Sequence, residues 1–296
     1  MRPPIPAVYG SVFELRPERL KWKQSRLFMK LSRILLLASL PLVLVGAVLM
    51  AVAFAKAYDP AVSNYFPAGS ALPVTGAVFA LLSLAAGLAS ALLAKRRSEP
   101  FAKPSAPSFA TLPTALGALV STVLLFVGGK PVIAVFFLAA AAFYALAAFP
   151  VAKRIADPLL VLGSVAVIAP VILNATFYFD MTVEMNAPVK VLLQMGLLGA
   201  MIYAILEVRS SAGQKCDYRL PVFTALAASL CGISGISVLV VALAQKTPTV
   251  VYAAAVPLIL GVFCNAAIRV CQAVLPPKGT PSAPETTEQD EEKNAL

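Results

Sequence analysis

The sequence contains no histidine and few charged residues. Histidine is the commonest general base and metal ligand near neutral pH, so its absence excludes many catalytic and metal-binding arrangements, including the usual intramembrane metalloprotease signature. Charged residues make up 13% of the chain, whereas a typical soluble domain has about 25%. Because 59% of the residues are hydrophobic, too little polar surface remains to cover a soluble globule.

Cysteine is also scarce, and none of the four cysteines falls in a predicted outer loop, so we expect no disulfide framework. Cys264 and Cys271 share a helical face, but two thiols without Asp or His neighbours make a poor metal site. The sequence has no Walker loop, serine nucleophile elbow or pair of intramembrane aspartates. It therefore predicts no metal, no cofactor and no enzymatic activity.

Long apolar runs are the main feature that the sequence does have. Runs of about 20 apolar residues predict membrane-spanning helices, and continuous rather than alternating apolarity excludes a transmembrane β-barrel. The predicted fold class is an all-α integral membrane bundle of about eight transmembrane helices. The predicted spans are 34–54, 74–94, 114–127 with its flanks, 132–149, 158–176, 189–206, 220–243 and 250–274.

One connection in this series predicts a contact. Only Gly128, Gly129, Lys130 and Pro131 join the third and fourth spans. A linker this short brings the two helices back alongside each other, so we expect a tight antiparallel hairpin.

The charges predict the orientation of the chain in the membrane. A net charge of +10 would suggest nucleic acid as a partner of a soluble protein, but here the basic residues lie mostly in the loops on one side. Each outer connection holds at most one, and the four outer basic residues are Lys56, Lys130, Lys190 and Lys246. The positive-inside rule then places both termini in the cytosol. We expect a multi-pass plasma-membrane protein in the lipid bilayer, with no nucleic-acid partner.

The sequence divides into three parts. Residues 1–33 form a basic cytosolic segment, residues 34–274 the transmembrane domain, and residues 275–296 an acidic cytosolic tail without apolar periodicity that we expect to be disordered. Two interpretations of the basic segment remain open. It is either a short helix on the membrane, with basic residues facing anionic lipids, or a solvated leader that fixes the orientation.

The last span carries the clearest group of polar residues. Gly261, Asn265, Arg269 and Gln272 follow helical spacing and form one polar stripe along its inner half. Polar groups are costly in hydrocarbon, so this stripe should face protein or water.

Glu207 reaches a similar depth at the inner end of span 189–206. A carboxylate in the last turn of a helix opposes the helix dipole, so Glu207 should require a cation from another helix. We expect a Glu207–Arg269 ion pair, with Asn265 bridging above it. The alternative is that Arg269 extends to the membrane interface and Glu207 simply lies in that interface.

A second group of polar residues lies at the opposite end of span 189–206. Gln194 and Lys190 are four residues apart on one helical face. Together with Asn174, Asp180 and Glu184 they could form an outward-facing ligand site. The alternative is that Gln194 makes an interhelical hydrogen bond and that the charged residues are ordinary interface charges.

One stretch of the chain supports a comparison with known sequences. It contains Asp180, then Met185-Asn186-x-Pro188-x-Lys190, an apolar span, and Glu207-x-Arg209. This pattern resembles uncharacterised polytopic membrane proteins of Gram-positive anaerobic bacteria. The resemblance covers a small part of the chain and implies no activity, although it argues against a well-studied enzyme family.

Two functional classes remain. Eight spans, prolines within helices and a polar stripe favour a small-solute transporter or permease-like component. The lack of a carboxylate in the middle of the membrane argues against a proton-driven carrier. The alternative is a non-catalytic membrane sensor, scaffold or subunit of a larger complex.

Overall fold

A computed structural model describes residues 15–58, 66, 69–95, 109–149, 156–212, 219–244, 246 and 249–274. Within these ranges the fold is all-α and has no strand, which confirms the all-helical part of the predicted fold class. The α-helices are α1 (Leu15–Ala57), α2 (Ala71–Lys95), α3 (Leu112–Val127), α4 (Pro131–Ala147), α5 (Ala156–Phe179), α6 (Pro188–Ser211), α7 (Arg219–Leu243) and α8 (Val250–Val274). A short 3-10 helix, Phe109–Thr111, leads into α3.

Seven of the described helices are long and apolar enough to cross a membrane. The remaining one, α4, is apolar but has only 17 residues. At about 1.5 Å per residue it is roughly 25 Å long, somewhat less than the hydrocarbon core of about 30 Å. By length and composition, these helices are compatible with a polytopic membrane protein, although α4 is one residue shorter than the predicted span 132–149.

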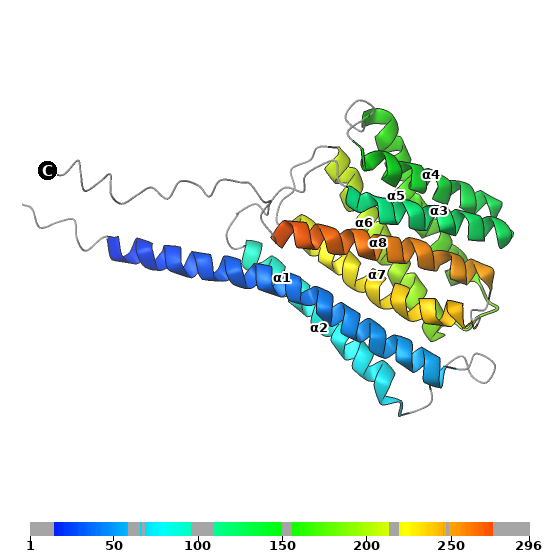
Figure 1. Ribbon diagram of the computed structural model, residues 1–296, viewed down its shortest axis with the longest axis horizontal. Helices are drawn as coiled ribbons and strands as arrows, with labels where there is room; N and C mark the ends of the chain where they lie inside the picture. Colours follow the sequence, from blue (N-terminus) through cyan, green and yellow to red (C-terminus); the bar gives the residue numbers. More distant parts are fainter. Residues whose placement is uncertain are drawn as a thin grey trace, which may run out of the picture.

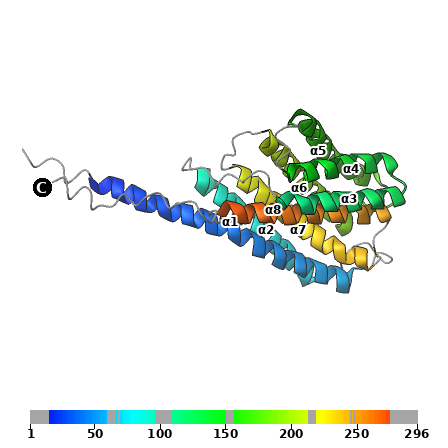
Figure 2. The same ribbon diagram turned by 45° about the horizontal axis from the view of Figure 1, so that its top comes forward.

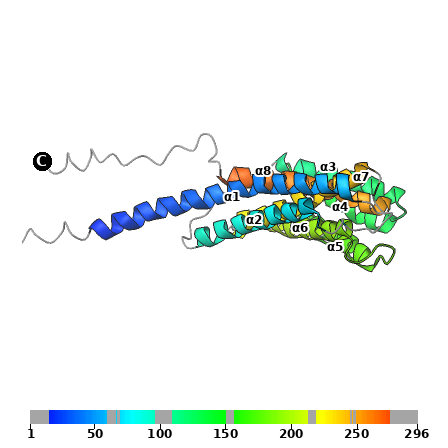
Figure 3. The same ribbon diagram turned by 90° about the horizontal axis from the view of Figure 1, so that it is seen from below.

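The first helix is longer than predicted. α1 has 43 residues and begins at Leu15, so it runs through the expected boundary between the basic segment and the first span. Its N-terminal part extends beyond the other helices (Figures 1, 2 and 3). Residues 1–14 and the predicted acidic tail, 275–296, lie outside the described residues.

Helices α3 to α8 form a ring. Each helix packs on the next one along the chain, α8 closes the ring by packing on α3, and α6 also contacts α8. The α1–α2 hairpin lies outside this ring and packs mainly on α7 (Figure 1). The ring encloses most of the buried hydrophobic side chains.

The α3–α4 hairpin confirms the contact predicted from its short linker. The two helices pack on each other, and Gly129 has a φ of 71°. This left-handed conformation favours glycine, because a Cβ there would clash with the backbone. Pro131 then begins α4 at a position where no helical amide hydrogen bond is lost.

The contact between α3 and α8 is the closest in the ring. A Cβ added to Gly117 would overlap the carbonyl oxygen of Pro257, and one added to Gly261 would overlap the backbone at Pro113 and Thr114. The two helix backbones therefore touch directly, as small residues allow in membrane proteins. We call this contact the α3–α8 seam.

Hydroxyl groups join the α1–α2 hairpin to the ring. Ser83 on α2 and Ser229 on α7 share a hydrogen bond with 2.7 Å between their Oγ atoms. Ser83 Oγ also lies 3.1 Å from the carbonyl oxygen of Ser39 on α1. Both contacts are buried, so α1, α2 and α7 meet at one polar point within otherwise apolar surfaces.

Substitution of Gly117 tests the α3–α8 seam. Gly117→Ala should lower the stability of the purified protein by about 1–3 kcal/mol, because the added methyl group has no space beside Pro257. The unfolding midpoint in detergent measures this change. The control is Gly87→Ala, because a Cβ there would meet only Ala225 at an ordinary 3.7 Å. Equal midpoints for the two variants would contradict the close α3–α8 contact.

Candidate functional site

Three side chains form a buried charged cluster between α6 and α8. Arg269 donates from Nε to Glu207 Oε1 at 3.1 Å and from Nη2 to Oε2 at 3.2 Å. Tyr203 donates its hydroxyl proton to the same carboxylate, with 2.5 Å between the oxygens. The Arg269 and Glu207 side chains are only 11% and 7% exposed. The geometry is that of a two-point, charge-assisted pair rather than of two side chains reaching separately to the interface.

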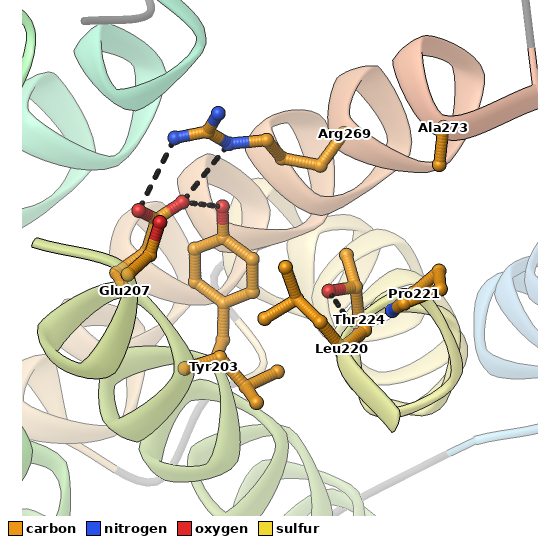
Figure 4. A pocket seen from close by; sticks show the side chains of 9 residues that line it. Tyr203, Glu207, Leu220, Pro221, Thr224, Arg269 and Ala273 are labelled. Carbon is orange, nitrogen blue, oxygen red and sulfur yellow. Dashed lines mark hydrogen bonds and ion pairs between the residues drawn. The ribbon is translucent and has the colours of Figure 1, made fainter. Parts of the chain in front are cut away.

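Local helical geometry explains how the cluster forms. Tyr203 and Glu207 are four residues apart on α6 and so lie on one face of that helix. Arg269 approaches this face from the last turns of α8 (Figure 4). We call this end of the ring the Glu207 end.

A small cavity lies beside the cluster. It has a volume of about 30 Å³, and a single water molecule needs roughly 10–15 Å³ on this measure. Polar groups of Glu207, Ser210 and Thr224 contribute to its walls, together with Arg269. Leu220, Pro221 and Ala273 form apolar parts of the wall (Figure 4). The cavity can therefore hold one or two waters, but no larger solute in this conformation.

The remaining polar residues of α8 continue along the helix from Arg269. Asn265 is fully buried and donates from Nδ2 to Thr114 Oγ1 on α3 at 3.2 Å. Thr114 in turn donates to the carbonyl oxygen of Gly261 at 3.1 Å. Asn265 therefore binds α3, and the expectation that it bridges above the Glu207–Arg269 pair is wrong. The reason is the α3–α8 seam, which brings the Thr114 hydroxyl within reach of the amide.

Three buried polar atoms on α8 have no hydrogen-bond partner among the described residues. They are Asn265 Oδ1, Arg269 Nη1 and Gln272 Oε1. The three residues follow helical spacing, so the atoms belong to one face, which we call the α8 polar face. Unpaired buried polar groups are uncommon in folded proteins. The three on one face set α8 apart from α5, which has one such atom, Asn174 Oδ1.

Lys190 is completely buried at the opposite end of the ring. Its Nζ donates to the backbone carbonyl oxygens of Asp180 at 2.7 Å and Val183 at 3.2 Å. These carbonyls directly follow α5, where the helix dipole favours a positive charge. Lys190 thus holds the α5–α6 connection in place. We call this end of the ring the Asp180 end.

The Asp180 carboxylate links this connection to α8. Its Oδ1 accepts hydrogen bonds from the Thr182 amide at 2.9 Å and the Thr182 hydroxyl at 2.6 Å. Its Oδ2 accepts one from the Tyr252 hydroxyl on α8 at 2.9 Å. The Tyr252 ring stacks on Phe177 of α5, with ring centroids 4.5 Å apart. The first turn of α8 is therefore attached to the end of α5 by both a polar and an aromatic contact.

These contacts lower the pKa of Asp180 below its ordinary value. Burial acts in the opposite direction, because it disfavours the charged form. The hydrogen bonds from Thr182 and Tyr252, together with the positive charge of Lys190, outweigh that effect.

The other residues of the predicted ligand site are not joined to this cluster. Asn174 is half-buried, and its Oδ1 has no partner among the described residues. Gln194 is half-buried and makes no recorded hydrogen bond within the described part of the chain, and Glu184 is exposed. Lys190 and Asp180 are already engaged with the α5–α6 connection. Ligand binding by any of these residues stays a prediction.

Sequence reasoning missed Tyr203 and Tyr252 in the two clusters, and Thr114 in the α3–α8 seam. Tyr203 was the easiest to find, because it lies four residues before Glu207. A tyrosine in the first turn of a span, such as Tyr252, is common in membrane proteins and gives no specific signal. Thr114 gave no signal, because its role depends on the packing of α3 against α8.

Comparison with known proteins adds nothing to this description. The chain matched no protein-family model, no curated protein and no solved structure. The resemblance to uncharacterised membrane proteins of Gram-positive anaerobes therefore stays a prediction, and function has to be argued from the two clusters.

A double-mutant cycle tests the Glu207–Arg269 pair. Glu207→Gln and Arg269→Gln should each lower stability by roughly 3–5 kcal/mol, because each leaves a buried charge without its partner. The double variant should cost much less than the sum. Unfolding in detergent measures all three. Small, additive effects would mean that each side chain is solvated separately.

The lowered pKa of Asp180 predicts a pH dependence. Its stabilising contribution is fully present above the ordinary Asp pKa of about 3.9. It is lost as the pH falls through the lower folded-state value, because the protonated carboxyl loses its charge-assisted contacts. The stability difference between the wild type and Asp180→Asn should therefore shrink when the pH is lowered from 7 to below about 4. A difference that stays constant with pH would show that the charge of Asp180 does not contribute.

Proposed function

We propose that this chain is a multi-pass plasma-membrane protein that passes a small solute across the bilayer, with α8 as its working helix. The observation that carries this proposal is the composition of α8. It has a proline within the helix, Pro257, a polar attachment at each end, and a face with unused hydrogen-bonding atoms between and beside them. Polar groups within a span are costly and usually functional, and transporters use interrupted helices to bind and release solutes.

The cluster at the Glu207 end supports a solute of low net charge. Arg269 brings one positive charge, and Glu207 cancels it within the same contact. The unpaired atoms of the α8 polar face offer one donor and two acceptors. A small polar solute with both donor and acceptor groups fits this set better than an ion.

The orientation belongs to the same proposal. With both termini in the cytosol, the Glu207 end faces inward and the Asp180 end outward. At about 1.5 Å per residue, the 43 residues of α1 extend over roughly 65 Å, about twice the hydrocarbon thickness. The basic N-terminal part of α1 would then start beyond the inner surface, where anionic lipids are its natural partners.

The second candidate function is a non-catalytic subunit, sensor or scaffold in a larger membrane complex. One observation favours it, namely the exposure of α2. Only 17% of its apolar window is buried within the chain, and large apolar side chains such as Val74, Leu81 and Leu92 are mostly exposed. Lipid or a partner helix would cover this face.

A ligand screen distinguishes the two candidates. A solute at a hundred times its dissociation constant stabilises the protein by about 2.7 kcal/mol, so thermal unfolding against a panel of small polar metabolites should reveal it. Asn265→Ala should weaken the response to the same solute, and reconstituted liposomes should take that solute up. Gln194→Ala tests the predicted ligand site at the Asp180 end by the same measurement, namely the response to that solute.

The opposite result supports the second candidate. A blank screen, together with a partner that copurifies in a fixed ratio from mild detergent, would overturn the transport proposal.

A further inference from the structure

The two ends of α8 are held by different partners. At the Asp180 end, the Tyr252 hydroxyl donates to Asp180 at 2.9 Å. At the Glu207 end, Arg269 donates twice to Glu207 at 3.1 and 3.2 Å. Both partners belong to the α5–α6 hairpin, so α8 is attached to one neighbouring unit at each of its ends.

Between these attachments, α8 rests on α3. Gly117 contacts the carbonyl of Pro257, Ser121 Oγ accepts from the Leu258 amide at 3.2 Å, and Thr114 bonds both Gly261 and Asn265. All the α8 residues in this seam lie between Tyr252 and Arg269 in the chain. The seam therefore supports α8 between its two attachments, and it is formed with α3 rather than with the α5–α6 hairpin.

Between the two attachments, apolar side chains pack where α6 meets α8. Leu193 and Leu197 on α6 and Ile259 and Val262 on α8 are at most 1% exposed. These packed side chains fill the layer, and the cavity at the Glu207 end lies beside the ion pair. Passage of a solute between α6 and α8 therefore requires these two helices to separate.

We propose that α8 is a gating helix that rocks on the α3–α8 seam, so that releasing its contact at one end strengthens its contact at the other. A helix that tilts as one body about a support between its ends moves those ends in opposite directions. Pro257 and the direct backbone contact at Gly117 place the support within the seam. The structure described here, with both attachments formed, is the closed state of this device.

This inference rests on the proposed function in one respect, since alternating openings serve a protein that passes a solute.

The test nevertheless needs no ligand. It uses the full chain with its four cysteines replaced by alanine and one reporter cysteine introduced at a time. Thr224→Cys reports the Glu207 end, where Thr224 lines the cavity and is 4% exposed. Val183→Cys reports the Asp180 end, where Val183 is 6% exposed.

The measured quantity is the rate of maleimide labelling in detergent, where both ends are reachable. Tyr252→Phe should speed labelling of Val183→Cys about tenfold, because one hydrogen bond to a charged group is lost. The paired change Glu207→Gln with Arg269→Gln should speed labelling of Thr224→Cys without leaving a buried charge. Ala118→Cys, fully buried on α3, is the control for general loosening, and its rate should not change.

The decisive measurement combines the changes. In the protein already opened by Glu207→Gln and Arg269→Gln, adding Tyr252→Phe should slow labelling of Thr224→Cys. Release of the contact at the Asp180 end lets α8 tilt back toward position 207 on α6. An unchanged or faster rate would overturn the proposal, because the two ends of α8 would then move independently of each other. Parallel increases at both reporters and at Ala118→Cys would also overturn it, as general destabilisation.

The ligand screen and the labelling experiment test separate proposals, so failure of one can be distinguished from failure of the other. Opposed changes in labelling at the two ends, together with a blank screen, would support the rocking helix and overturn transport. A solute that stabilises the protein, together with independent labelling of the two ends, would support transport and overturn the rocking helix.

Discussion

A hydrocarbon solvent supplies no hydrogen-bond partner, so every polar side chain within the bundle has to find one in the protein. This constraint explains why the polar residues gather where helices meet. Ser83 meets Ser229 where α2 joins α7, Thr114 meets Asn265 in the α3–α8 seam, and Glu207 meets Arg269 between α6 and α8. The same constraint makes the unpaired atoms of the α8 polar face the feature that requires a functional explanation.

Apolar burial cannot hold these helices together, because lipid tails are as apolar as leucine. Close packing has to do so instead, and glycine permits it by letting backbones approach each other. Gly117 and Gly261 serve the α3–α8 contact in this way. A seam of this kind is specific in its register, since moving α8 by one turn would place Cβ atoms against carbonyl oxygens. It can therefore act both as a firm contact and as a fixed axis for tilting.

The sequence predicted the helical membrane class, the α3–α4 hairpin and the residues of the Glu207–Arg269 pair, because each depends on local composition or spacing. It left a short helix over the basic segment as one of two alternatives, but it did not predict that this helix continues into the first span as α1. It also misplaced the partner of Asn265 and omitted Tyr203 and Tyr252. Those contacts depend on which helix faces are adjacent, and one sequence contains no direct signal for that.

The two clusters differ in how easily they can open. Glu207 and Arg269 are nearly buried and satisfy each other at two points, so separating them exposes both charges to a poor solvent. Asp180 retains its two hydrogen bonds from Thr182 and its neighbour Lys190 when the Tyr252 hydroxyl leaves. Breaking the contact at the Asp180 end therefore leaves a carboxylate that is still stabilised, close to water. In the rocking movement proposed above, the Asp180 end opens more readily because its charge keeps its partners, and opening the Glu207 end costs more.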